Sequence, residues 1–181
     1  MEYNLYDYDG RYDNDVCKAE NKFIKKLLLF ITEPDEVVLD IGAGTGLVHN
    51  MLDNRNYVIS TDINPQSAKI IKDGCQSTRV IIETMDATKA LNTYFSRDII
   101  TCMFALHYLS FKDIWTILNS RSVCAIYDKP YKHPHSIYSG KPLMFYKEHW
   151  KKHLFIKLCM ILLRIKPIPL TGDCYQILIT G

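Results

Sequence analysis

A short apolar segment that ends in a cluster of glycines constrains the fold of this chain more than any other feature. Residues 37–41, Val-Val-Leu-Asp-Ile, form a nearly continuous apolar run, and Gly42, Gly44 and Gly46 follow it at once. Such a run is typical of a parallel strand with both faces buried, because helices cover both sides of a parallel sheet. Glycines after the strand permit a tight turn and let a ligand approach the backbone closely. The segment therefore predicts a central strand of an α/β protein with a ligand-binding loop at its end.

Strand-like and helix-like segments alternate along the rest of the chain. A helix is predicted over residues 15–31, where apolar residues recur at helical spacing. Further strands are predicted near 57–61 and at 79–83, 98–104, 122–127 and 175–180, and further helices at 65–73, 88–94, 111–119 and 144–153. The short apolar run at 155–165 does not distinguish a strand from a buried helix, and of the two we favour a strand. The alternation indicates βαβ units wound into a parallel sheet.

Length and composition fit one compact domain. The chain has 181 residues, 48% of them hydrophobic and 23% charged, and it has no internal repeat or low-complexity linker. We therefore expect a single domain over residues 1–181. Within it we expect an N-terminal lid and helix at 1–31, a ligand-binding core at 36–128, and a basic substrate-side segment with the final strands at 129–181.

The sequence predicts a cytoplasmic protein that makes no membrane contact. Its first fifteen residues are acidic and rich in tyrosine and lack the apolar run of a secretory signal. The later run 154–165 is short and is interrupted by Lys157 and Arg164, so it cannot span a bilayer. The six cysteines are scattered without any close pair, which is typical of reduced, buried thiols rather than of disulfides or a zinc site.

Three consecutive predicted strands end in an acidic residue. Asp40 closes the first, Asp62 follows 22 positions later at the end of the second, and Asp86 follows the third. In open α/β sheets ligands bind outside the carboxyl ends of the strands, so these acids can converge on one ligand, with Asp62 placed to accept both ribose hydroxyls of a nucleoside. The alternative is that each is a turn-forming or helix-capping aspartate, and this alternative is strongest for Asp86.

The glycine loop differs from a dinucleotide-binding loop in two ways. Only one residue separates Gly44 from Gly46, and an acid, Asp40, stands two positions ahead of Gly42. A pyrophosphate requires an uncharged helix N-terminus whose N–H groups face the negative charge. A sulfonium amino acid instead requires an acid for its ammonium group, with small residues around it.

These motifs make residues 15–128, together with a final strand at 174–180, resemble the class I S-adenosylmethionine-dependent methyltransferases. The resemblance implies a Rossmann-like α/β fold, a mostly parallel seven-stranded sheet with helices on both faces and an antiparallel last strand, and S-adenosyl-L-methionine as the cofactor. It implies that Asp40 and the glycine loop hold the methionine end, Asp62 the ribose, and Asp86 with Ala87 the adenine. The cofactor-binding residues expected on this basis are Asp40, Gly42, Ala43, Gly44, Gly46, Asp62, Ile63, Asp86, Ala87, Phe104 and Tyr12.

The fourth predicted strand runs into Phe104-Ala-Leu-His-Tyr108, which by resemblance lies beside the transferable methyl group. This segment is also similar to one in messenger RNA cap guanine-N7 methyltransferases, where a His-Tyr pair lines the guanine pocket. We therefore expect His107 and Tyr108 to be the catalytic residues, with His107 as the base if the acceptor needs one. Alternatively, both are structural side chains at a strand end. Tyr12 either closes over the cofactor as part of a lid or belongs to a frayed terminus.

The charge distribution suggests an anionic acceptor. Residues 1–128 carry 13 basic and 18 acidic side chains, whereas residues 129–166 carry nine basic and one acidic. The basic segment is interleaved with tyrosines and a tryptophan, which suits RNA or a nucleotide, but it could equally be a solvated surface. The alternatives are a small-molecule acceptor and a catalytically silent methyltransferase-like binding subunit. No metal site is expected, because the four late histidines lack accompanying cysteine or acidic ligands.

Overall fold

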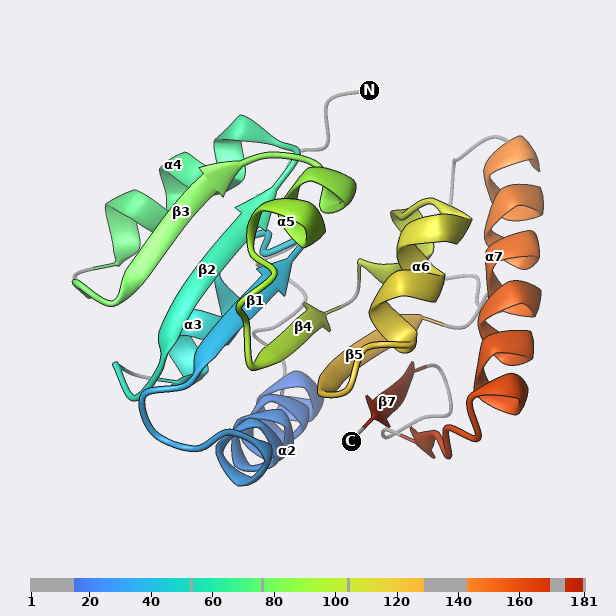
Figure 1. Cartoon of the computed structure of the whole chain (residues 1–181), viewed down its shortest axis with the longest axis horizontal. Coiled ribbons are helices and arrows are strands. Elements are labelled where there is room, and N and C mark those ends of the chain that lie inside the picture. Colours follow the sequence, from blue (N-terminus) through green and yellow to red (C-terminus); the bar gives the residue numbers. More distant parts are fainter. Residues whose placement is uncertain are drawn as a thin grey trace. The chain divides into compact units, whose positions relative to one another are not determined.

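The computed structural model describes residues 15–52, 54–75, 77–103, 105–128, 143–169 and 175–180. It divides into two compact units, Met1–Met103 and Phe104–Gly181 (Figure 1). The first contains α2 (Asp15–Ile31), β1 (Val37–Ile41), α3 (Leu47–Leu52), β2 (Tyr57–Asp62), α4 (Pro65–Gly74), β3 (Val80–Thr84), α5 (Ala87–Thr93) and β4 (Ile99–Met103). The second contains the 3-10 helix η1 (Leu106–Tyr108), α6 (Phe111–Leu118), β5 (Val123–Asp128), α7 (Leu143–Leu162), β6 (Ile168–Pro169) and β7 (Tyr175–Thr180). The expectation of a single domain stays a prediction.

The four strands of the first unit pair in parallel in the order β3-β2-β1-β4. In the register of the sheet, Val38 of β1 lies between Val58 of β2 and Ile99 of β4, and all three side chains are buried. Helices cover both faces of these strands: in Figure 1, α5 lies in front of them and α4 behind β3. The predicted buried parallel strand at residues 37–41 is confirmed, because a strand covered on both sides has no solvent face for polar side chains.

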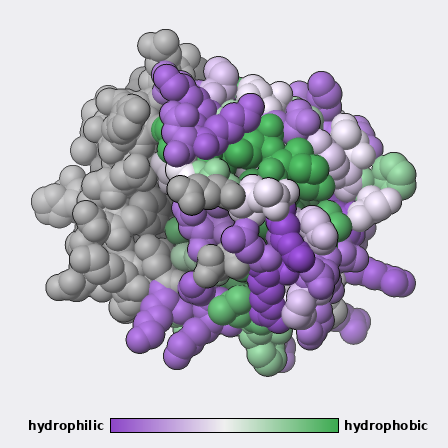
Figure 2. Space-filling view, turned by 90° about the vertical axis from the view of Figure 1, so that its left-hand side faces the viewer, coloured by the Kyte–Doolittle hydropathy of each residue, from purple (hydrophilic) through white to green (hydrophobic). Residues whose placement is uncertain are grey.

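The strand β3 forms the outer edge of the first unit. Its buried and exposed positions differ from those of β1, since Ile81 is exposed and its neighbours are half-buried. Figure 2, which looks at this side of the molecule, shows a mostly hydrophilic surface with a smaller apolar area. A sheet-edge strand of mixed character is the ordinary outcome where no further strand pairs with it.

Three of the helices begin at a side chain that caps them. Asn64 accepts a hydrogen bond from the Gln66 N–H at the start of α4, where Pro65 occupies the first helical position. Asp86 accepts from the Lys89 N–H at the start of α5, and Ser110 does so from Asp113 at the start of α6. Each cap satisfies a backbone donor that the helix leaves unpaired, which explains why the helices begin where they do.

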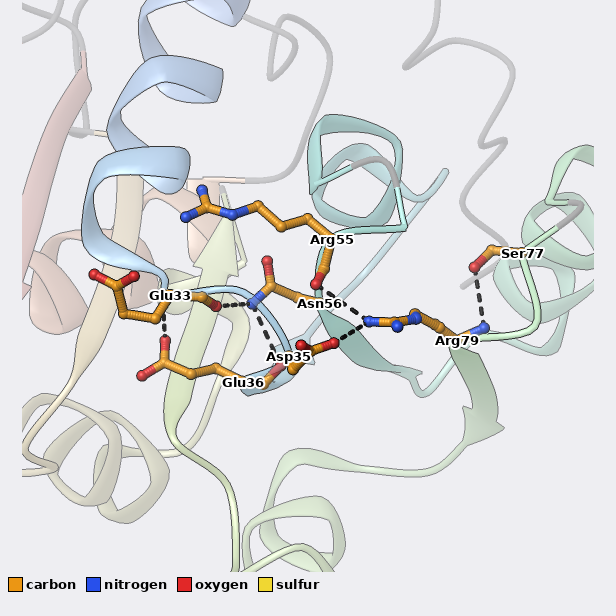
Figure 3. A network of polar contacts seen from close by, with 7 residues as sticks. All are labelled: Glu33, Asp35, Glu36, Arg55, Asn56, Ser77 and Arg79. Atoms are coloured by element: carbon orange, nitrogen blue, oxygen red, sulfur yellow. Dashed lines mark hydrogen bonds and ion pairs between the residues drawn. The ribbon is translucent and has the colours of Figure 1, made fainter.

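A polar network holds the amino ends of β1, β2 and β3 together (Figure 3). The buried Asn56, just before β2, donates from Nδ2 to the Glu33 carbonyl at 2.6 Å. Arg79, just before β3, forms an ion pair with Asp35, and Arg55 donates to the Leu29 carbonyl at 2.7 Å. Because the strands run parallel, their amino ends lie together, and the network is therefore at the end of the strands opposite the glycine loop. It therefore leaves the carboxyl ends of the strands for a ligand.

The strands of the second unit pair antiparallel. Ile177 of β7 lies opposite Ile126 of β5 on one side and Ile168 of β6 on the other. The antiparallel last strand that the family resemblance implied is therefore confirmed, as is the α/β fold class, with seven strands among the described residues. Cys102 and Cys124 are buried, as predicted, and burial raises the pKa of Cys124 to about 12.

The predicted strand at residues 155–165 is wrong, because α7 continues to Leu162. Within this run Ile156, Cys159 and Met160 are buried, whereas Leu158 and Ile161 are exposed. Burial at spacings of three and four is the helical period, which nearly continuous apolar residues conceal in the sequence.

Three short elements were not predicted: α3, η1 and β6. In the described part of the chain, no helix is both long and apolar enough to cross a membrane.

Candidate active site

The glycine loop after β1 is a fixed turn with a left-handed backbone at each glycine. Gly42, Gly44 and Gly46 have φ values of 72°, 56° and 90°, a region that other residues rarely adopt. The N–H groups of Gly42 and Ala43 both donate to the Thr61 carbonyl, at 2.9 and 3.0 Å. The loop is therefore tied to the end of β2, and the tight turn that its glycines predicted is confirmed.

Gly44 and Asp62, which the sequence assigned to one ligand, are in direct contact. The Gly44 N–H donates to Oδ2 of Asp62 at 2.9 Å, and the Asn64 N–H donates to Oδ1 at 2.8 Å. A Cβ added at Gly44 would meet no other atom within 4 Å. The loop thus presents open space beside a half-buried carboxylate whose orientation two backbone donors hold. The loop after β1 and the end of β2 are therefore side by side.

Asp40 is almost completely buried, with 1% of its surface exposed. Its Oδ1 accepts a hydrogen bond from Oγ1 of Thr101 at 2.9 Å, while its Oδ2 is buried and has no hydrogen-bond partner in the described part of the chain. Burial raises the pKa of Asp40 to about 7; the Thr101 bond lowers it, and the negative charge of Asp62 raises it further. A buried carboxylate with one unpaired oxygen is stabilised in its ionised form by a nearby cation.

His49 packs directly behind the loop. A Cβ added at Gly46 would lie 2.6 Å from Nδ1 of this imidazole and nearer still to its Cε1. The imidazole is buried in α3, and burial lowers its pKa. Gly46 is therefore required both for its backbone conformation and for the absence of a side chain.

The predicted adenine-side residues lie at the ends of β2 and β3. Ile63 directly follows Asp62 and is 74% exposed, an unusual position for a large apolar side chain. The Met85 N–H donates to the Asp62 carbonyl at 2.9 Å, which ties the segment before Asp86 to the ribose-side acid. Asp86 caps α5, as its alternative interpretation held, and Ala87 is buried at the first position of that helix. Their contacts with a cofactor stay predictions.

His107 and Tyr108 belong to η1 in the second unit. His107 is buried and Tyr108 is 38% exposed, and their rings lie 4.0 Å apart between centroids at a tilt of 43°. Nζ of Lys152 in α7 donates to the Leu109 carbonyl, one residue beyond Tyr108. The backbone next to the exposed Tyr108 thus binds a lysine that lies 43 residues further along the chain than Leu109. The catalytic assignment of the pair stays a prediction, and Phe104 and Tyr12 lie outside the described residues.

Sequence reasoning missed Thr101 and His49. Thr101 pairs with Asp40 in the β1–β4 register, and its signal in the sequence is a hydroxyl within an otherwise apolar buried strand. His49 follows the loop in a helix too short to be recognised from its period. Among the described residues, no group of three histidine, cysteine or acidic side chains is placed to hold a metal ion.

Comparison with known proteins finds a match to one domain family. Residues 38–123 match the family model of a methyltransferase domain, whereas a comparison with curated proteins finds no match. This region spans the glycine loop, Asp62, Asp86 and the His107–Tyr108 segment. It thus includes all but one of the residues that the sequence assigned to the site, the exception being Tyr12.

Solved structures of methyltransferases share the fold. A protein of Staphylococcus aureus provisionally named a caffeoyl-CoA O-methyltransferase superposes with a TM-score of 0.69 at 13% identity, covering 99% of this chain and 93% of that one. The magnesium protoporphyrin IX methyltransferase of Synechocystis superposes with a TM-score of 0.60 at 13% identity, and the match covers 92% of this chain and 82% of that one. A protein of Listeria monocytogenes provisionally named an S-adenosylmethionine-dependent methyltransferase gives 0.51 at 22% identity, and the match covers 62% of this chain and 56% of that one. Residues 38–123, just under half of the chain, thus match a methyltransferase domain, and the chain has the fold of solved S-adenosylmethionine-dependent methyltransferases.

Proposed function

We propose that this chain binds S-adenosylmethionine at the glycine loop and Asp62, and that the methyl acceptor is RNA or a nucleotide. The observation that carries the cofactor site is the hydrogen bond from the Gly44 N–H to Asp62 beside the unfilled space at Gly44. This contact supports the proposal, because it brings the loop proposed for the amino-acid end next to the carboxylate proposed for the ribose.

The residues present fit the charge and shape of this cofactor. Its ammonium and sulfonium groups are cationic, and the buried Asp40 has one carboxylate oxygen without a hydrogen-bond partner among the described residues. Asp62 uses each oxygen for one backbone donor, and a carboxylate oxygen has a further lone pair for a ribose hydroxyl. The exposed Ile63 offers an apolar surface to the adenine ring. Asp40 thus acts on the amino-acid end by its charge and Asp62 on the ribose by hydrogen bonds.

The chemistry requires little from the protein beyond alignment. When bound, the cofactor supplies a methyl group that is already activated for in-line displacement. The chain's own residues hold the two reactants in line and exclude water. An acceptor nitrogen with a free lone pair needs no base, whereas an oxygen or a protonated nitrogen needs one. In that case we assign proton removal to the buried imidazole of His107.

The acceptor proposal is supported by Tyr108 and by the basic character of the second unit. The half-exposed ring of Tyr108 offers a surface on which a base can stack. Lys152 is bound to the Leu109 carbonyl beside it, and nine of the ten charged residues in 129–166 are basic. A nucleotide could stack its base on the Tyr108 ring and place its phosphate near these basic side chains.

A small-molecule acceptor is the second candidate. Proteins that share the fold over more than nine tenths of this chain carry names that describe small acceptors, caffeoyl-CoA and magnesium protoporphyrin IX. A silent binding subunit is a weaker candidate, because the sequence retains Asp40, the glycine loop and Asp62. Isothermal titration calorimetry that detects no binding of S-adenosylmethionine would favour the silent subunit.

The cofactor site is tested by Asp62→Ala, with Asp73→Ala in the exposed end of α4 as the matched control. A carboxylate that accepts hydrogen bonds from a ligand contributes about ten- to a hundredfold in affinity. We expect Asp62→Ala to weaken S-adenosylmethionine binding by that factor in calorimetry while the circular dichroism spectrum is retained, and Asp73→Ala to bind as the natural chain does. Unchanged affinity in Asp62→Ala removes this residue from the site.

The acceptor is tested by transfer of a radiolabelled methyl group to RNA, to mononucleotides and to extracts of small metabolites. Binding of RNA should weaken as salt rises, because phosphate contacts release counterions. Tyr108→Ala should reduce labelling of RNA or nucleotide, whereas Tyr108→Phe, which retains the stacking surface, should not. Labelling confined to the metabolite fraction, without salt-dependent RNA binding, would establish the small-molecule alternative.

A further inference from the structure

The outward face of α7 carries a contiguous set of exposed apolar side chains, which we call the α7 stripe. Its members are 48–74% exposed, and they are Trp150, Leu154, Leu158, Ile161 and Leu162. Single exposed leucines are normal on a protein surface, but contiguous apolar patches mark interaction sites. The α7 stripe is therefore a candidate docking surface.

The stripe lies on one side of the helix and the core of the second unit on the other. The spacing from Trp150 to Leu154, Leu158 and Ile161 is four, four and three residues, which keeps these side chains on one helical face. The buried face consists of His153, Ile156, Cys159 and Met160. Lys152, which bonds to Leu109 beside Tyr108, lies on the side away from the stripe, so the proposed acceptor contacts and the stripe use different sides of α7.

The charges around the stripe have one sign. Residues 150–169 contain five basic side chains and no acidic one. Lys151 and Lys157 lie beside the stripe on the helix, and Arg164 and Lys166 follow its last turn; all four are exposed. Among the side chains that the structure describes, the charged ones beside the stripe are cationic, which matches a partner that is apolar inside and anionic at its rim.

Only one of three possible occupants matches both the charge and the apolar surface. A second copy of the stripe would bring like charges together, which is destabilising. An RNA would pair with the cations but would leave the leucines and isoleucine without apolar contact. A lipid surface with anionic headgroups accepts the apolar side chains among its acyl chains and the cations among its headgroups. We propose that the α7 stripe docks on an anionic membrane surface.

This proposal differs from the expectation of no membrane contact, which depended on the length needed to span a bilayer. A helix that lies in the plane of the interface buries its apolar face to a depth of only about 5–10 Å, so it needs neither the length nor the uniform hydropathy of a spanning helix. The absence of a spanning helix among the described residues is therefore compatible with surface docking. The exposed Trp150 is of the residue type that favours this interface.

The proposal is tested with the full chain and sedimented vesicles. One set contains phosphatidylcholine alone and the other contains phosphatidylcholine with phosphatidylserine. We expect binding to the anionic vesicles and at least tenfold weaker binding to the neutral ones, since each basic side chain near an anionic surface contributes about fivefold. Binding to the anionic vesicles should also weaken as salt rises.

The variant Leu158→Glu with Ile161→Glu places two acidic groups in the stripe without touching the buried face. It should lose vesicle binding while its circular dichroism and thermal transition stay native. The matched control is Phe30→Glu, which changes a side chain of similar exposure on α2 and should bind vesicles as the natural chain does. A milder pair, Leu158→Ser with Ile161→Ser, tests the same surface if the acidic variant does not fold.

Three results would overturn the proposal. The first is no binding to anionic vesicles at low salt. The second is binding that the stripe variants retain, which would assign the lipid contact to another surface. The third is a concentration-dependent dimer, or an RNA complex, that the stripe variants abolish while the natural chain ignores vesicles; the stripe would then serve that partner instead.

Discussion

Gly44 and Gly46 provide a matched pair for testing the geometry of the loop. Both have a left-handed backbone, which costs an alanine roughly 1–2 kcal/mol. The space around them differs: an added methyl group at Gly44 meets nothing within 4 Å, whereas one at Gly46 overlaps the buried imidazole of His49. Forcing extra volume into a packed site costs roughly a further 1–3 kcal/mol. Gly44→Ala should therefore cost about 1–2 kcal/mol of unfolding free energy, and Gly46→Ala about 2–5 kcal/mol.

The measurement is urea unfolding of the full chain, followed by circular dichroism, with the double variant Gly46→Ala/His49→Ala to complete a mutant cycle. Because His49→Ala removes the side chain that the new methyl group meets, the double variant should be more stable than the sum of the single effects predicts, by about 1–3 kcal/mol. Gly44→Ala should retain most of its stability but lose affinity for S-adenosylmethionine, since its methyl group enters the space beside Asp62. The reasoning is refuted if Gly46→Ala costs no more than Gly44→Ala, or if the cycle shows no coupling.

Three further predictions concern the buried carboxyl and the corrected helix. Because burial raises the pKa of Asp40 from 3.8 to about 7, the folded chain retains a proton there that the unfolded chain releases. The contribution of Asp40 to stability should therefore fall as the pH rises from about 4 to 7 and stay level above, by at most about 4 kcal/mol. Asp40→Asn should abolish this fall in stability when urea unfolding is compared at pH 4 and pH 8, and it should weaken cofactor binding. If the substitution changed the free energy of unfolding equally at both pH values, Asp40 would not be the group with the raised pKa. Thr101→Val removes the hydrogen-bond donor to Asp40 and should move the midpoint of the pH dependence of cofactor affinity to higher pH in calorimetric titrations. An unchanged midpoint would show that the Thr101 hydroxyl does not lower the pKa of Asp40. Ile156→Ala should lower the free energy of unfolding by about 2–5 kcal/mol, because α7 buries this side chain. Leu158→Ala should change it by no more than about 0.5 kcal/mol, because α7 exposes that side chain. Equal losses of stability in thermal unfolding would favour a strand at residues 155–165, in which both side chains face one side.

Several features of the fold could be predicted from the sequence because they depend on local pattern. The bounds of α2, β1 and β7 agree with the predicted ranges, since an apolar period and its interruption at turn residues are both local. The glycine loop and Asp62 were likewise identified together, because a strand end followed by glycine and a strand end followed by an acid each leave a mark in the sequence. The predicted family and cofactor agree with the domain match.

The sequence by itself determined the alternation of the longer strands and helices up to β5, the turn after β1 and the neighbouring ends of β1 and β2. The tertiary structure alone decided the rest of the site: the bond from Gly44 to Asp62, the hydroxyl of Thr101 on Asp40, the imidazole behind Gly46, and the helical continuation of α7. Thr101 and Asp40 are 61 residues apart, and parallel pairing of β1 with β4 brings them together. The physical reason is that a residue's own neighbours in sequence set its local conformation, whereas the packing of distant segments sets its burial, its charge state and its partners.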